Sequence, residues 1–312
     1  MVKFLLRRLI AAFITLIVAS FTIFTALNLA RGDPAALLAG NKATPAMMAA
    51  IRKRLGLDVP LPSRYWSWLS SAAHGNFGTS YEYHQSVASL LVPRIGVTAM
   101  LVIYATLIVI VFGIGLSILS TVIKAVALPV TALSAIGIAI PSFVAATLLI
   151  AVFAVHFTWF PVLGGGTGFI DMLYHLTLPA VALALSWTAY VTQISRTALR
   201  AESASEHVET EIVRGLAPSA IFRRHILRNA AIPIVTVTGL TFGGLIVGTV
   251  IIEQAFGISG VGAFFVQAVS AKDAPVVETI SMIFVASFII INTCLDLAHA
   301  ALDPRIRSGV HQ

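Results

Sequence analysis

The sequence predicts an all-α membrane protein with six transmembrane helices, and its composition is the first reason. Of the 312 residues, 58% are apolar and 11% are charged, whereas about 25% are charged in an ordinary soluble domain. The mean hydropathy is +0.94. So few polar groups cannot cover the surface of a soluble fold of this length. The composition therefore excludes a common soluble enzyme, a disordered chain and a disulfide-stapled secreted domain.

The six predicted spans are apolar stretches of roughly 20 residues or more, the length that crosses a hydrocarbon core of about 30 Å. The first follows Lys3, Arg7 and Arg8 and is too long for a signal peptide, so we expect an uncleaved helix. The spans cover residues 9–30, 98–123, 128–155, 176–195, 231–252 and 276–301.

Basic residues predict that both termini are cytoplasmic. With the N-terminus inside, twelve of the 20 lysines and arginines fall in inner segments, and only Lys272 falls in the two short outer loops. The other seven lie in a long first outer segment, and long segments cross with little regard to charge. The chain then divides into a tail and first span (1–30), an external subdomain (31–95), a core of five spans (96–302) with an inner loop (196–229), and a cytoplasmic tail (303–312).

Several kinds of site are disfavoured. The net charge of +7 comes without a basic stripe interleaved with aromatics, so we predict no nucleic-acid interface. The single cysteine, Cys294, is interpreted as a packing residue, and no metal site is predicted. Residues 257–260 read as the G-x-S-G motif of rhomboid intramembrane proteases. However, the candidate base His299 would lie roughly 30 Å from Ser259 along a helix that rises 1.5 Å per residue. We predict no catalytic residue.

The two larger outer segments carry aromatic and glycine clusters. Tyr65, Trp66 and Trp68 predict an interfacial aromatic belt, with contact to an external partner as the alternative. The outer loop 156–175 is rich in glycine, but no Lys-Ser/Thr pair follows it as in a phosphate-binding loop. We interpret it as a flexible turn.

The inner loop is the most polar stretch of the chain and predicts two short helices. Residues 206–214 have acidic residues early and a basic one late, which suits the helix dipole. Gly215 stands where a C-terminal cap is wanted, and Pro218 stands at a first-turn position. Residues 220–227 predict the second helix, with Arg223, Arg224 and Arg228 near its end. This knob could dock onto a partner, and a solvated charged loop is the alternative.

Ionisable and helix-breaking residues are few within the spans. Asp296 lies toward the inner part of span six, while Glu253 and Glu278 are expected at outer ends, where water is close. The sequence therefore indicates neither an ion-coupled carrier nor a channel filter, and the energy for any transport is expected from elsewhere. Pro141 predicts a kink in span three, with Ser142 helping to satisfy the freed backbone.

Span five is marked by glycines. Gly239 and Gly243 are four residues apart, and so are Gly244 and Gly248. This spacing puts small residues on one helical face and lets backbones approach closely. The face could pack statically or line an interface that slides.

Short motifs run the length of the chain in a specific order and spacing. They are Arg7-Arg8, RGDPA at 31–35, LGLD at 55–58, GNFGTS at 75–80, IPSF at 140–143, HLTLPA at 175–180, IEQAF at 252–256, GVG at 260–262 and LDPRIR at 302–307. Together they resemble the B-type permease subunit of dipeptide, oligopeptide and nickel ATP-binding-cassette (ABC) importers. The resemblance implies the type I importer fold.

The resemblance also gives the inner loop a role. Such permeases carry an EAA signature there, and Glu209 and Gly215 match it. The departures from the signature are Thr210, Glu211, His225 and Arg228. By resemblance, residues 216–224 form a coupling helix that docks into a cytoplasmic ATPase. The implied coupling residues are Glu209, Gly215, Leu216, Ala217, Pro218, Ser219, Arg223 and Arg224.

The implied assembly contains a second, homologous permease, two ATP-binding subunits and an external solute-binding protein. Span five is expected among the helices that line the pathway. No G-x-x-x-x-G-K-S/T motif occurs in the 312 residues, so ATP and Mg²⁺ would belong to the partners. We predict a peptide solute and a plasma-membrane location. The alternatives are nickel or another small solute, or an uncoupled carrier or channel.

Overall fold

The computed structural model describes residues 2–29, 35, 44–54 and 56–302. Every regular element in these residues is a helix, and the one bridge between extended segments pairs Thr79 with Ser86. Within the same residues, five helices are long and apolar enough to cross a membrane, or six if a bent pair counts as one span. The predicted all-α membrane fold is confirmed.

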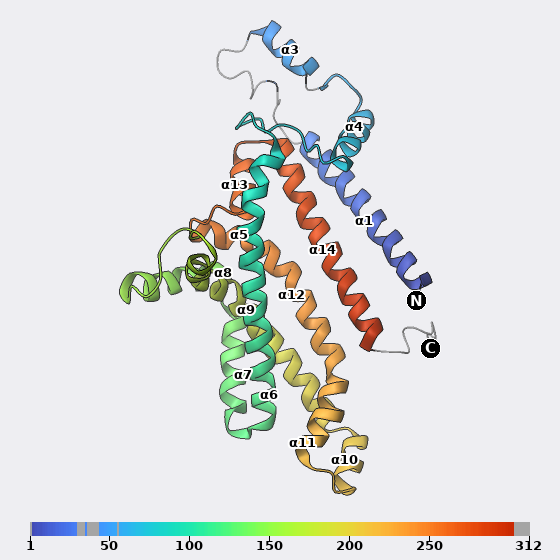
Figure 1. Ribbon diagram of the computed structural model, residues 1–312, viewed down its shortest axis with the longest axis vertical. Coiled ribbons are helices and arrows are strands. Elements are labelled where there is room, and N and C mark those ends of the chain that lie inside the picture. The colour runs from blue at the N-terminus through green and yellow to red at the C-terminus, as the bar shows by residue number, and fades with distance from the viewer. Residues whose placement is uncertain (1, 30–34, 36–43, 55, 303–312) are drawn as a thin grey trace.

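The first half of the chain forms an elongated bundle capped at one end by two short helices (Figure 1). The elements are α1 (Val2–Leu29), α3 (Pro45–Arg54), α4 (Leu61–Ala73), α5 (Val87–Ile108), the π-helical segment η2 (Val109–Ile114), α6 (Gly115–Val122), α7 (Lys124–Ala139), α8 (Ser142–Leu149) and the π-helical segment η3 (Ile150–His156). In Figure 1, α3 and α4 stand at the top of the long axis.

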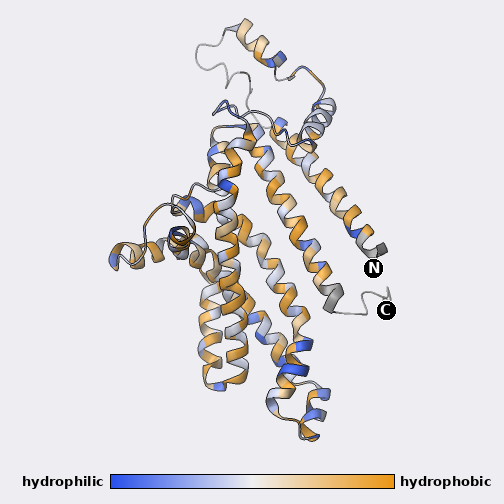
Figure 2. Cartoon of the chain, in the orientation of Figure 1, coloured by the Kyte–Doolittle hydropathy of each residue, from blue (hydrophilic) through white to orange (hydrophobic). Residues whose placement is uncertain are grey.

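The second half supplies the centre and the opposite end of the bundle. Its elements are α9 (Phe169–Ser203), α10 (Glu206–Val213), α11 (Pro218–Ile221), the π-helical segment η4 (Phe222–Ile226), α12 (Leu227–Ala255), α13 (Val261–Ser270) and α14 (Ala274–Leu302). Helices α10 and α11 lie at the bottom of Figure 1, and apolar residues dominate the long helices in Figure 2.

The core of the bundle forms around α9. This helix packs against α12, α7, α5 and η2, and the buried side chains at its centre include Leu101, Leu183 and Leu245. In the π-helical segment η2, the carbonyl of Gly113 lies 3.2 Å from Thr192 Oγ1 of α9, a hydroxyl that also donates to Thr188 O of its own helix at 2.7 Å. This contact links η2 to α9.

Predicted span three is two helices rather than one kinked helix. Helix α7 ends at Ala139, α8 starts at Ser142, and the two meet at an angle of 104°. Ile140 has an extended ψ of 114°, as expected for a residue that precedes proline. The freed carbonyl of Ile140 accepts a 2.6 Å hydrogen bond from Ser186 of α9. The expected help from Ser142 was wrong, because the donor comes from a neighbouring helix.

Helix α1 is attached to α14 and α4 by polar contacts. Near one end, Arg8 forms an ion pair with Asp296 of α14. Near the other end, the hydroxyl of Tyr65 lies 2.7 Å from Ser20 Oγ, and its ring packs edge-on against Phe21. Tyr65 is buried, so it fits neither of the roles expected for the aromatic cluster. It fastens α4 to the first span.

Candidate functional site

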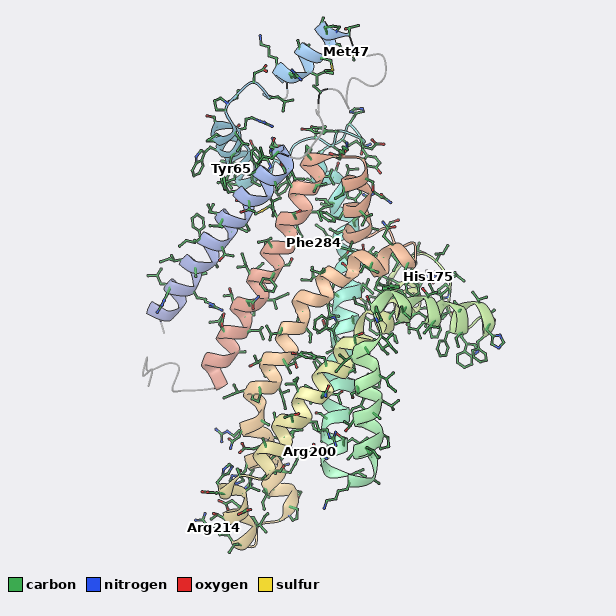
Figure 3. All side chains as sticks on the ribbon, turned by 180° about the vertical axis from the view of Figure 1, so that it is seen from behind. Met47, Tyr65, His175, Arg200, Arg214 and Phe284 are labelled. Atoms are coloured by element: carbon green, nitrogen blue, oxygen red, sulfur yellow. The ribbon has the colours of Figure 1, made fainter. Side chains whose placement is uncertain are left out.

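The inner loop forms a hairpin at the end of the molecule opposite α3. Arg214 on the hairpin and Met47 on α3 mark these two ends in Figure 3. Helix α10 is followed by a turn at Gly215, after which α11, η4 and α12 form one continuous helix from Pro218 to Ala255. The expectation of a separate second helix ending near residue 227 was wrong. No breaker stands between Pro218 and Pro233, and buried Ile226 and Ala230 anchor the intervening turns.

The turn is closed by a Schellman motif at Gly215. The N–H of Leu216 donates to the carbonyl of Glu211 at 3.2 Å, and the N–H of Gly215 donates to Ile212 at 3.0 Å. Gly215 has φ +75°, in the left-handed region where a Cβ is strained. No atom lies within 4 Å of the place a Cβ would take. The requirement for glycine is therefore conformational.

The tip of the hairpin exposes apolar side chains to solvent. Val213 is 87% exposed and Ile212 is also exposed, whereas Val208 of the same helix is buried against Leu199 and Ile221. The predicted coupling residues Glu209, Ala217, Pro218, Ser219, Arg223 and Arg224 are all exposed, and Leu216 is half-buried. One face of the hairpin thus fixes it to the bundle, and the other is free.

A polar cluster holds the base of the hairpin, and no periodic pattern of residues predicts it. Glu202 Oε1 at the end of α9 lies 2.8 Å from His207 Nε2 and accepts a 2.7 Å hydrogen bond from Asn229 Nδ2. These contacts join α9, α10 and the start of α12. Arg214 pairs with Glu211 at 3.2 Å within the hairpin. In Figure 2 this end of the molecule contains many hydrophilic residues.

The four glycines of α12 sit against two neighbouring helices. A Cβ on Gly244 would lie 1.9 Å from the Trp187 ring of α9, and one on Gly248 would lie 2.6 Å from Leu183. On the other side, a Cβ on Gly239 would meet Leu295 of α14 at 1.9 Å, and one on Gly243 would meet Phe288 at 2.8 Å. All four positions are occupied by contacts within this chain. A Cβ at any of the four positions would therefore require a neighbouring side chain to move.

The exposed face of α12 is apolar and runs between the glycine pair that meets α14 and the pair that meets α9. Leu240, Val247 and Ile251 are all exposed large hydrophobic side chains. Their spacing of seven and four residues keeps them on one helical face. If α12 lines a pathway or meets a second subunit, this stripe is the surface it offers.

Glu253 and Glu278 are buried, so the expected exposure to water was wrong. Glu253 is 0% exposed; its carboxylate accepts hydrogen bonds from Thr98 Oγ1 at 2.6 Å and from the backbone N–H of Ala263 at 2.9 Å. It thereby caps the N-terminus of α13, a favourable place for a negative charge. A Cβ on Gly260 would lie 2.3 Å from this carboxyl group, which explains that glycine. Ser259 is an exposed turn residue between α12 and α13.

Comparison with known proteins identifies the architecture. Residues 113–308 match the family described as binding-protein-dependent transport system inner membrane component, and residues 1–102 match the N-terminal family of the same components. The chain belongs to this permease family. It is therefore a multi-pass membrane protein of the ABC importer type, as the motifs indicated.

Three relatives align with the permease over nearly their whole length. It is 34% identical to a probable peptide ABC transporter permease protein of Sinorhizobium fredii, with 97% of this chain and 99% of that protein aligned. It is 35% identical to a putative peptide permease protein of Brucella suis and 32% identical to the glutathione transport system permease protein GsiC of Escherichia coli. For each of these two, 98% of this chain and 99% of the relative are aligned.

Proposed function

We propose that the permease is a transmembrane subunit of an ATP-driven importer of dipeptides or oligopeptides. The hairpin of α10 and α11 supports this role most directly, because it carries exposed apolar side chains at an end of the molecule that is rich in hydrophilic residues. Burial of the exposed side chains of Val213 and Ile212 against a partner would lower the free energy of the complex. In this proposal the partner is a cytoplasmic ATPase. The hairpin and both termini then lie in the cytoplasm.

The proposed complex contains a second permease, two ATP-binding subunits and an external solute-binding protein. ATP binding and hydrolysis take place on the ATPases, whose closure moves the hairpins of the two permeases together. The chain itself is not an enzyme in this proposal. The exposed stripe at Leu240, Val247 and Ile251 is the face of α12 assigned to the second permease or to the pathway.

The peptide solute is proposed from the relatives, two of which are named peptide permeases and one a glutathione permease. Glutathione is itself a short peptide, so the three names share one chemical class. Nickel or another small solute is the outcome that would contradict this assignment.

The test is uptake by the reconstituted complex. The permease is purified with the subunits that co-elute with it and placed in vesicles containing ATP. Labelled dipeptide, tripeptide and Ni²⁺ are then supplied with the binding protein. ATP-dependent accumulation of a peptide is the expected result. Uptake that persists without the ATPases would indicate a carrier or channel, and uptake of Ni²⁺ alone would overturn the peptide assignment.

A further inference from the structure

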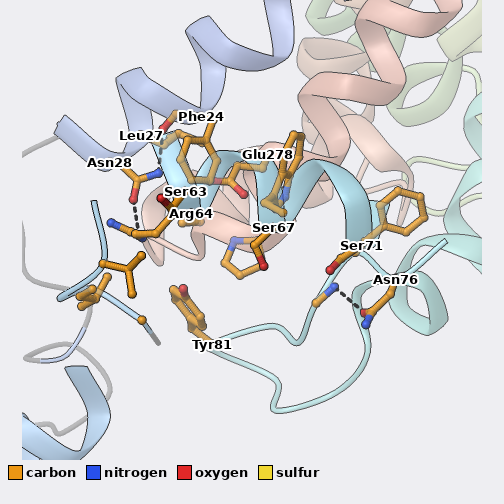
Figure 4. A pocket seen from close by; sticks show the side chains of 18 of the residues that line it. Phe24, Leu27, Asn28, Ser63, Arg64, Ser67, Ser71, Asn76, Tyr81 and Glu278 are labelled. Atoms are coloured by element: carbon orange, nitrogen blue, oxygen red, sulfur yellow. Dashed lines mark hydrogen bonds between the residues drawn. The ribbon is translucent and has the colours of Figure 1, made fainter. Parts of the chain in front are cut away.

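Two cavities that share lining residues lie between α1, α4 and the start of α14. Figure 4 shows the first of them. The first has a volume of about 530 Å³ and a partly polar lining that includes Asn28, Ser63, Arg64, Ser67, Tyr81 and Glu278. The second, of about 590 Å³, is almost entirely apolar and is lined by Phe13, Leu16, Ile17, Met282, Ile283 and Ala286, among others. Trp68 and Phe77 line both cavities.

The polar cavity holds a carboxyl group that accepts no hydrogen bond from the described residues. Glu278 is 5% exposed and lines the cavity together with Arg64, whose charge acts on it without a direct ion pair. Glu253, the other buried glutamate at a helix end, accepts hydrogen bonds from Thr98 and Ala263. A buried, unbonded carboxylate is costly, so the cavity is chemically incomplete on its negative side.

The side chains of Arg64 and Tyr81 line the same cavity and can donate hydrogen bonds. The Arg64 guanidinium donates a 2.5 Å hydrogen bond to Asn28 Oδ1, which is drawn in Figure 4, and other guanidinium N–H groups remain available. Burial, reinforced by the charge of Glu278, raises the pKa of Tyr81 to about 12. Its hydroxyl therefore keeps its proton at physiological pH and can donate. A ligand here meets the carboxyl group of Glu278, the basic side chains of Arg64 and Lys53, and the hydroxyl of Tyr81.

A second orphaned polar atom lies where the cavities join. The indole Nε1 of Trp68 is buried and has no hydrogen-bond partner among the residues that the structure describes. Its ring borders the polar cavity on one side and the apolar one on the other. An amphipathic occupant with an oxygen at this junction would accept the indole hydrogen bond.

We propose that the two cavities together hold one phospholipid whose headgroup carries a primary ammonium, such as an ethanolamine phospholipid. The ammonium contacts Glu278, the phosphate contacts Arg64, an ester oxygen accepts from Trp68, and an acyl chain occupies the apolar cavity. The opposite charges of ammonium and phosphate match the opposite charges of Glu278 and Arg64.

The extent of the cavities favours a lipid over a small zwitterion. On α1, the lining runs from Asn28 in the polar cavity to Phe13 in the apolar one. The 15 steps from one residue to the other span about 22 Å at 1.5 Å per residue, which is comparable with one leaflet including its headgroup region, half of a bilayer about 40–45 Å thick. A free peptide or amino acid would leave the apolar cavity empty. The proposal does not depend on which solute the permease carries.

The test measures lipid that stays bound to the full-length chain in the assembly in which it is extracted from the membrane. The assembly is reconstituted with equal amounts of phosphatidylethanolamine and phosphatidylcholine that carry the same acyl chains, and is then washed in mild detergent. Retained lipid per permease is counted by mass spectrometry. We expect the ethanolamine lipid to be enriched about tenfold or more, because the choline headgroup has no N–H to donate to Glu278.

Three variants decide the assignment. Glu278→Gln should bring the retained ratio to that of the bulk lipid, whereas Glu82→Gln, an exposed acid in the same outer loop as Tyr81, should leave it unchanged. Ala286→Trp fills the apolar cavity and should reduce retention of both lipids, which keeps the proposal testable if Glu278→Gln fails to assemble. Unchanged lipid in both Glu278→Gln and Ala286→Trp overturns the proposal. So does displacement of the lipid by chain-free glycerophosphoethanolamine or by a dipeptide at equal concentration.

Discussion

Gly244 in α12 and Gly215 in the hairpin both stood out in the sequence, but the structure constrains them in opposite ways. Gly244 has ordinary helical geometry and no room, since a Cβ there would lie 1.9 Å from Trp187. Gly215 has room on every side and an unusual backbone, with φ +75°. In the long helix, the residue at this position is restricted by the space between helices. In the hairpin, it is restricted by backbone conformation, and the outer surface stays free for a partner.

The largest loss of stability is expected from a substitution at Gly244, where a neighbouring ring leaves no space for a side chain. Gly244→Ala should destabilise the permease by about 3 kcal/mol, because a rigid indole ring must move in a close-packed core. The midpoint of thermal unfolding of the purified protein measures this. Gly115→Ala is the matched control, since that helical glycine has no atom within 4 Å of the Cβ position, and its midpoint should stay level or rise slightly.

A double variant sharpens this first test. Trp187→Phe shortens the ring that the new methyl group meets, so it should restore part of the stability lost in Gly244→Ala. Equal midpoints for Gly244→Ala and Gly115→Ala would show that the contact is not limiting.

The hairpin glycine should respond to side-chain type rather than to side-chain volume. Gly215→Val places a β-branched residue in the left-handed region, which costs about 1–2 kcal/mol. We expect uptake per ATP hydrolysed to fall while the subunit stays in the membrane, with an unfolding midpoint lowered by only a few degrees. Gly215→Asn, which adopts this conformation more readily, should retain coupling. Normal coupling in Gly215→Val would contradict the conformational argument.

Two valines of α10 separate folding from docking. Val213→Ser removes an exposed apolar side chain and should weaken ATPase co-purification by about fivefold without lowering the unfolding midpoint. Val208→Ser, at a position that is 2% exposed, should lower the midpoint instead. If Val213→Ser leaves ATPase binding intact, the exposed tip is not the docking surface.

The smallest effect is expected from a surface charge. Glu209→Lys reverses an exposed charge on α10 and should weaken association with the ATPase by about two- to fivefold at low salt. Because exposed charges are screened, the difference should vanish at about 1 M salt. A salt-independent loss would point to misfolding of the hairpin, and no loss at any salt would count against a role for Glu209.

The sequence predicted the long helices and the turn at Gly215 because both depend on local signals. An apolar run of sufficient length predicts a membrane span whichever helices pack against it. A glycine that follows a helix with early acidic and late basic residues predicts a C-terminal cap. The sequence could not predict the 104° break at Ile140 and Pro141, since proline alone does not fix an angle. That angle is set where Ser186 of α9 bonds the freed carbonyl.

Buried acids were the main error. Glu253 and Glu278 both lie near helix ends, where sequence reasoning expects water. The folded chain instead brings Thr98 and the start of α13 over Glu253, and α1 and α4 around Glu278. Residues 1, 30–34, 36–43, 55 and 303–312 lie outside the described part, so the RGDPA motif and the C-terminal tail remain predictions apart from Ala35 and Leu302.

The sequence alone determined that this chain crosses a membrane several times and carries a helix–glycine–helix hairpin in its most polar loop. Hydropathy and backbone preference act over a few residues and can be read without knowing the fold. Tertiary structure decided which glycines lie against neighbouring side chains. It also decided that Glu253 is hydrogen-bonded and that Glu278 lines a cavity. Those outcomes depend on side chains from helices far apart in the chain, and only packing brings them within contact distance.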